Sequence, residues 1–132
     1  METYLQALGW WNFGGSLFML GFFHKEFGKK VMNEWTGIFA TPFVLDYWGK
    51  FWMGWAIGLN IFFGAVNILS VHWCMREMQL LCLLFDLFSY SVFFALVIWG
   101  TKTKHLGKGV YSVYLIFGIW ISWGAYSLYS TL

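Results

Sequence analysis

Four long apolar stretches constrain the fold more than any other feature of this sequence. A helix that crosses the hydrocarbon core of a bilayer needs roughly 20 mainly apolar residues. Each stretch reaches about this length, and together they occupy most of the 132 residues. They cover residues 4–23, 48–72, 78–99 and 109–129. The sequence therefore predicts an all-α integral membrane protein: a bundle of four transmembrane helices in which residues 1–132 form a single membrane domain.

The composition agrees with immersion in lipid. Hydrophobic residues make up 60% of the chain and charged residues only 11%, whereas soluble domains have about 25% charged residues. The first stretch lacks the basic leader region and the small-residue cleavage site of a signal peptide, so we interpret it as the first span. With a net charge of +2 and no long basic block, nucleic acid is not an expected partner.

Lysine and arginine are distributed unevenly among the connecting segments. Segments 24–50 and 100–108 carry seven of these basic residues, whereas the connection between the second and third stretches has only Arg76. Cytoplasmic loops of membrane proteins are enriched in Lys and Arg. We therefore expect a multi-pass protein with segments 24–50 and 100–108 in the cytoplasm and both termini outside.

The segment at about 25–47 has a pattern of its own. In HKEFGKKVMNEW, the apolar residues Phe27, Val31 and Trp35 recur every four positions, and charged residues occupy the other faces. This pattern is typical of an amphipathic helix, which we expect on the inner membrane surface. The apolar run that follows, TGIFATPFVLDYW, is too short to span and contains Pro42. We interpret it as a connector, with a re-entrant gate as the alternative.

An aspartate, Asp86, lies near the centre of the third stretch. A charged residue at mid-membrane costs about 2.5 to 3.5 kcal/mol on insertion scales, so we expect Asp86 to face other helices. At 100° per residue, it shares one arc of the helix with Gln79, Cys82, Ser89, Tyr90 and Phe93. The third helix is therefore predicted to turn a polar stripe into the bundle.

The other three stretches offer polar or small faces at a comparable depth. Small residues let membrane helices approach one another, and amides and hydroxyls bridge them. These faces comprise Gly9, Asn12 and Ser16; then Ala56, Asn60, Gly64, Asn67 and Ser70; then Tyr111, Gly118, Ser122 and Ala125, with Tyr126 at the margin. At 1.5 Å per residue, they predict a shared polar layer roughly 12 Å below the outer interface. Its predicted members are Asn12, Asn60, Asn67, Asp86, Ser122 and Tyr126.

Two interpretations of this layer remain open. In the first, Asp86 is protonated, because burial disfavours its charge, and it closes the bundle through a hydrogen bond to Asn12, Asn67 or Tyr126. In the second, Asp86 is a binding or proton-transfer group, the usual role of an acid inside a membrane. The predicted ligand-binding residues are then the members of the layer together with the deep Trp123, part of an aromatic cage for a hydrophobic or amphipathic ligand.

Residue patterns for catalysis or metal binding are missing from the sequence. We find no nucleophile with a base, no paired carboxylates and no metal cluster. Cys74 and Cys82 lack the spacing of a redox or zinc motif. His72, Arg76 and Glu77 form a small charged group at the outer end, which we interpret as a solvated turn, with the rim of a pocket as the alternative. No catalytic residue, metal ligand or cofactor is predicted.

These observations favour a small non-enzymatic membrane protein that acts as a binding or accessory subunit. Its expected partners are the lipid bilayer, other membrane subunits or a further copy of itself, and a hydrophobic small molecule. One alternative is a small proton-linked transporter or channel that works as an oligomer. Another is a membrane enzyme for a lipid-like substrate, with Asp86 as its acid or base.

Overall fold

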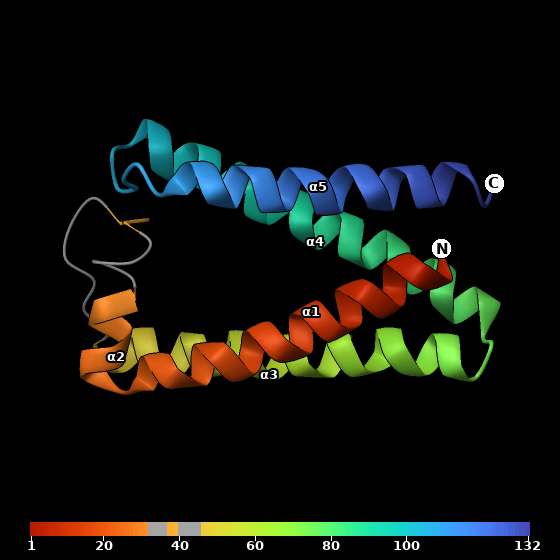
Figure 1. Ribbon diagram of the computed structural model, residues 1–132, viewed down its shortest axis with the longest axis horizontal. Helices are drawn as coiled ribbons and strands as arrows, with labels where there is room; N and C mark the ends of the chain where they lie inside the picture. The colour runs from red at the N-terminus through yellow and green to blue at the C-terminus, as the bar shows by residue number, and fades with distance from the viewer. Residues whose placement is uncertain (32–36, 40–45) are drawn as a thin grey trace.

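The chain is folded almost entirely into helices. The structure, a computed structural model, describes residues 1–31, 37–39 and 46–132. Over these residues the prediction of an all-α protein is confirmed. In chain order the elements are α1 (Glu2–Leu20), the short 3-10 helix η1 (Gly21–Phe23), α2 (Lys25–Lys29), α3 (Tyr47–His72), α4 (Arg76–Lys102) and α5 (Val110–Tyr129) (Figure 1).

Two helices have the length and composition of membrane spans. They are α3 and α4, which contain 26 and 27 residues. α1 and α5 do not meet the same criterion of length and hydropathy within the described residues. Their sequences are rich in Gly, Trp, Tyr and Ser, residues with low hydropathy even where they face lipid. The structure thus supports two of the four predicted spans by this criterion.

A tight turn joins α3 to α4 and sets them antiparallel. Cys74 adopts a left-handed backbone conformation with φ 53°, and the amide of Met75 donates to the carbonyl of Ser70 at 3.0 Å. At the other end of α3, the side chain of Asp46 caps the helix by accepting from the amide of Gly49. The turn joins α3 and α4 as a hairpin, and the cap stabilises the start of α3.

The helices pack mainly as two pairs, α1 on α3 and α4 on α5. The α1–α3 contact is closest at Gly9 and Gly64, where a Cβ atom added to Gly64 would lie 2.8 Å from the carbonyl oxygen of Gly9. The pairs meet where the N-terminal half of α1 crosses α4 (Figure 1). There, Tyr4, Leu5 and Leu8 pack with Cys82 and Leu83 in a buried cluster.

The two ends of the molecule differ in what they carry. Both termini and the α3–α4 turn lie at one end, and α2 and the α4–α5 connection lie at the other (Figure 1). The lysine-rich segments are therefore grouped at one end, as the sequence predicts. After the orientation expected from the sequence, we call the end with the termini the outer end and the opposite one the inner end.

The inner end is closed by contacts between two connecting segments. Phe39 and Leu106 form an isolated antiparallel bridge, and the amide of Gly107 donates to the carbonyl of Ile38 at 2.6 Å. Of the predicted amphipathic helix, α2 is present, and Val31 is buried. Trp35 and the run around Pro42 lie outside the described residues, so the prediction for the segment at about 25–47 is tested only in its first part.

Candidate functional site

A hydrogen bond between side chains of α3 and α4 is the centre of the candidate site. The side-chain amide of Asn67 donates to the carboxyl group of Asp86 at 2.8 Å. Asn67 is 1% exposed and Asp86 3% exposed. Of the three partners that the sequence offers for Asp86, the structure selects Asn67. Asp86 thus faces the interior of the bundle, as its cost in an apolar environment requires.

Two further hydrogen bonds extend this polar contact toward the outer end. The hydroxyl of Ser70 donates to the backbone carbonyl of Asn67 at 2.8 Å, and the side-chain amide of Gln79 donates to the carbonyl of Ser70 at 3.1 Å. Ser70 and Gln79 are each 2% exposed. Buried polar groups are costly unless they are hydrogen-bonded, and this series satisfies several of them between α3 and α4.

A separate hydrogen bond ties α1 to α4. The hydroxyl of Tyr90 donates to the side-chain oxygen of Asn12 at 2.7 Å. Asn12 is therefore in the polar interior, as predicted. Its partner Tyr90 belongs to the predicted stripe on α4, but the sequence offers no means of pairing two residues that are 78 positions apart.

The sequence predicts that Ser122 and Tyr126 on the fourth helix face the interior of the bundle, and this prediction is wrong. The buried residues of α5 are Val110, Gly124 and Ser127, whereas Ser122 is exposed and Tyr126 is 68% exposed. Neither belongs to the polar layer. The cause is packing, because a Cβ on Gly124 would lie 2.8 Å from both Leu87 and the hydroxyl of Tyr4. Gly124 lies on the side of α5 opposite Ser122, and its small size lets α5 approach α4 and α1. Because that side of α5 is buried, Ser122 faces outward.

Asn60 and Trp123, the remaining predicted site residues, are both partly buried but have different neighbours. Asn60 is only partly buried, and within the described residues the hydrogen-bond partner of Asp86 is Asn67 instead. Trp123 is partly buried and stacks on Trp120 with ring centroids 5.6 Å apart. Tyr4 meets Trp123 edge to face at 5.7 Å. Trp123 therefore packs against the core beneath α1.

Two buried hydroxyl groups have no hydrogen-bond partner among the residues that the structure describes. They belong to Tyr4 and Ser16, both 1% exposed. An unpartnered buried hydroxyl costs free energy. The sequence places Ser16 on the correct face of α1, but it gives no indication that Tyr4 is buried, because Tyr is common at the ends of membrane helices.

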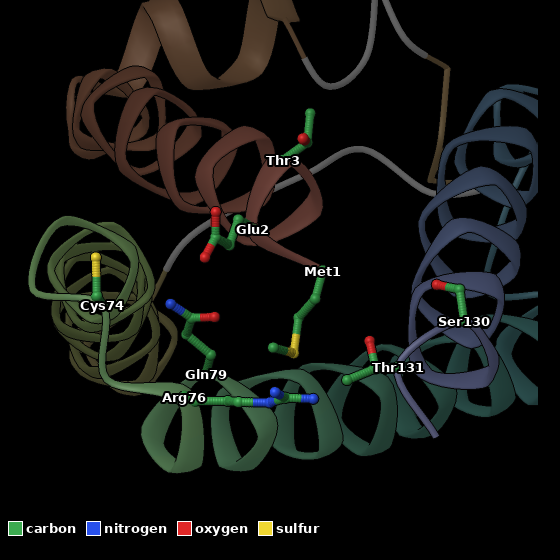
Figure 2. Close-up of a pocket in the computed structure, with 8 residues that line it drawn as sticks. All are labelled: Met1, Glu2, Thr3, Cys74, Arg76, Gln79, Ser130 and Thr131. Atoms are coloured by element: carbon green, nitrogen blue, oxygen red, sulfur yellow. The ribbon is translucent and has the colours of Figure 1, made fainter.

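A cavity of about 610 Å³ opens at the outer end. Figure 2 shows its walls, formed by the start of α1, the start of α4 and the end of α5. Its charged residues are Glu2 and Arg76, and its uncharged polar residues include Gln79 and Thr131. Of the predicted outer charged group, Arg76 lines the cavity, whereas His72 and Glu77 are not among its lining residues.

Gln79 links the two parts of the candidate site, the outer cavity and the Asn67–Asp86 contact. It lines the cavity and belongs to the hydrogen-bonded series that leads to Asp86.

Within the described residues, no group of three or more His, Cys, Asp or Glu side chains is arranged to hold a metal ion. Comparisons with protein-family models, curated proteins and solved structures find no match.

Proposed function

We propose that the chain is a four-span membrane protein and that it acts as a binding or accessory subunit. The main support is that polar side chains are buried and apolar side chains are exposed, the reverse of a water-soluble protein. Asp86, Asn67 and Gln79 are buried, whereas many of the large apolar side chains are exposed. Only 28% and 17% of the residues in the apolar windows of α3 and α4 are buried. Such a surface is stable in lipid and unstable in water.

The orientation follows from the charges at the two ends. The lysine-rich segments meet at the inner end, which supports a cytoplasmic location for that end. Both termini and Cys74 would then lie outside the cytoplasm. α1 and α5 complete the four spans because they lie along α3 and α4 and carry the polar or small faces against which the interior packs.

An exposed aromatic stripe on α3 supports the role of a subunit. Trp48, Trp52, Trp55, Leu59 and Phe62 are all exposed and recur at alternating intervals of four and three residues. This spacing places them on one helix face and is the spacing by which helices interdigitate. The stripe runs well beyond the interfacial belt in which tryptophan is common. A helix of another membrane protein would pack on it.

The test is purification from the protein's own membrane in a mild detergent, followed by native mass spectrometry. We expect a partner protein at a fixed ratio or a defined small-molecule adduct. Replacing Trp52 and Trp55 by leucine should reduce recovery of a partner protein, whereas Trp99→Leu, which changes an exposed tryptophan of α4, should not. A bare chain in every mild detergent would contradict the proposal.

A proton-linked transporter is the second candidate, favoured by one observation. The hydrogen-bonded series Gln79–Ser70–Asn67–Asp86 connects the outer cavity to a carboxyl group inside the bundle. Acids buried between membrane helices are typical members of proton relays, and Asp86 would be the group that carries the proton. Asp86→Asn in proteoliposomes would abolish proton-coupled uptake of the substrate if this candidate is correct. Unchanged uptake with Asp86→Asn would exclude it.

A further inference from the structure

The outer cavity carries one positive and one negative side chain that do not neutralise each other. Arg76 and Glu2 both line it and are exposed, and no ion pair joins them within the described residues. Figure 2 shows Arg76 extending from the start of α4 toward Thr131, with Glu2 on the α1 side of the cavity. The volume of about 610 Å³ lies within the range of about 300 to 1,000 Å³ for small-molecule pockets.

Several side chains in the uncharged walls of the cavity offer hydrogen-bond acceptors. The hydroxyl groups of Ser130 and Thr131 donate to the carbonyl of Ser127 at 3.0 and 2.7 Å, so their oxygens are left to accept. The side-chain amide of Gln79 donates to Ser70, and its oxygen is likewise an acceptor. Together with the Glu2 carboxylate, these oxygens suit a ligand group with several N–H donors.

Arg76 is a positively charged hydrogen-bond donor, so it suits an anionic group of the ligand. A guanidinium group binds phosphate or carboxylate through two parallel hydrogen bonds. α4 also begins at Arg76, and the positive end of a helix favours a nearby anion. A ligand that satisfies both sides carries an anion and a primary ammonium group close together.

We propose that the outer cavity binds a zwitterionic head group that contains a phosphate and a primary ammonium group. The phosphate contacts Arg76, and the ammonium group contacts Glu2 and the acceptor oxygens. This inference rests on the proposed membrane location, because the ends of α1, α3, α4 and α5 then place the cavity at the level of the outer lipid head groups. Phosphatidylethanolamine and soluble phosphoethanolamine both have the required chemistry.

The test is lipid binding by the full chain after delipidation in detergent. Phosphatidylethanolamine, phosphatidylcholine and phosphatidylglycerol with identical acyl chains are added in turn, and bound lipid is counted by native mass spectrometry. We expect phosphatidylethanolamine to bind about tenfold more tightly than phosphatidylcholine, a difference of about 1.4 kcal/mol. The quaternary ammonium of phosphatidylcholine has no N–H group to donate to Glu2.

Two variants separate the roles of the charged residues. Arg76→Gln should weaken binding of both phosphatidylethanolamine and phosphatidylglycerol, because each has a phosphate. Glu2→Gln should weaken binding of phosphatidylethanolamine alone. Lys102→Gln and Glu26→Gln remove the same charges at the inner end and should leave binding unchanged. Far-UV circular dichroism of each variant checks that the helices remain folded.

A binding measurement with soluble phosphoethanolamine shows whether the ligand is a lipid or a soluble molecule with the same head group. If phosphoethanolamine binds the delipidated chain while neither lipid binds, the ligand is a soluble zwitterion; if phosphatidylethanolamine binds more tightly than phosphatidylcholine, the ligand is the lipid. Equal binding of phosphatidylethanolamine and phosphatidylcholine, or no binding of either lipid or of phosphoethanolamine, would overturn the inference. The proposed function is judged separately, by partners or adducts recovered from the native membrane.

Discussion

Asn67 of α3 donates a 2.8 Å hydrogen bond to Asp86 of α4, and both side chains are almost fully buried. The two residues are 19 positions apart and face each other because the turn at Cys74 folds α3 and α4 into a hairpin. Asp86 is tolerated inside an apolar chain since a neutral amide is held against it. The contact closes the bundle, and it also ends the hydrogen-bonded series that begins at the outer cavity.

The contribution of this contact can be measured by a double-mutant cycle. Asn67→Ala and Asp86→Ala, alone and together, should give a coupling free energy of about 0.5 to 2 kcal/mol, the size found for hydrogen bonds between membrane helices. Reversible unfolding in mixed micelles is the measurement. Asn60→Ala is the control, because Asn60 is on the same helix and only partly buried. A coupling free energy near zero would show that the contact does not stabilise the fold.

Tyr4, which is buried, and Tyr90, which is partly buried, should respond differently to loss of the hydroxyl group. Tyr90→Phe leaves the side-chain oxygen of Asn12 without its donor, so the free energy of unfolding should fall by about 1 kcal/mol. Tyr4→Phe removes a hydroxyl that has no partner among the described residues, so stability should be unchanged or higher. Thermal unfolding in detergent compares them, and Tyr4→Phe serves as the control for Tyr90→Phe. Equal losses in both variants would contradict this assignment.

Gly64 should be the least tolerant glycine of α3. A methyl group in Gly64→Ala would lie 2.8 Å from the backbone oxygen of Gly9, and relief of this overlap requires α1 and α3 to separate. The expected loss of stability is about 1 to 3 kcal/mol. Gly58→Ala is the matched control, since a Cβ at Gly58 meets nothing within 4 Å. If both variants unfold at the same temperature, the close approach of α1 and α3 is wrong.

Cysteine labelling tests the proposed orientation. Cys74 is exposed at the outer end and Cys82 is buried, so a membrane-impermeant maleimide should label intact cells at Cys74 only. In a Cys74→Ser background, Lys104→Cys introduces a thiol at the inner end, which should react only after the membrane is permeabilised. Labelling of Lys104→Cys but not of Cys74 in intact cells would indicate the reverse orientation. Labelling of both sites from outside would exclude an odd number of crossings between them and therefore the four-span arrangement.

Much of the fold can be predicted from the chain alone. The apolar stretches predict the four long helices to within a few residues of their observed ends. On α1, α3 and α4, the polar residues fall on single faces, so Asn12, Asn67 and Asp86 are correctly predicted to point inward. The cost of burying polar groups in an apolar setting is strong enough to orient these helices. Whether α1 and α5 cross a membrane remains a prediction.

Packing between helices determines two features that the sequence patterns do not: which side of α5 is buried, and which distant residues are in contact. Serine and glycine occur on both sides of α5, and its buried side is chosen by the contact of Gly124 with Tyr4 and Leu87. The pairing of Tyr90 with Asn12 and the meeting of Glu2 with Arg76 around one cavity join residues that are far apart in the chain. Helical periodicity identifies which side of a helix is polar, but distances between helices depend on how closely their backbones approach. Those distances are determined by the complete set of packed side chains.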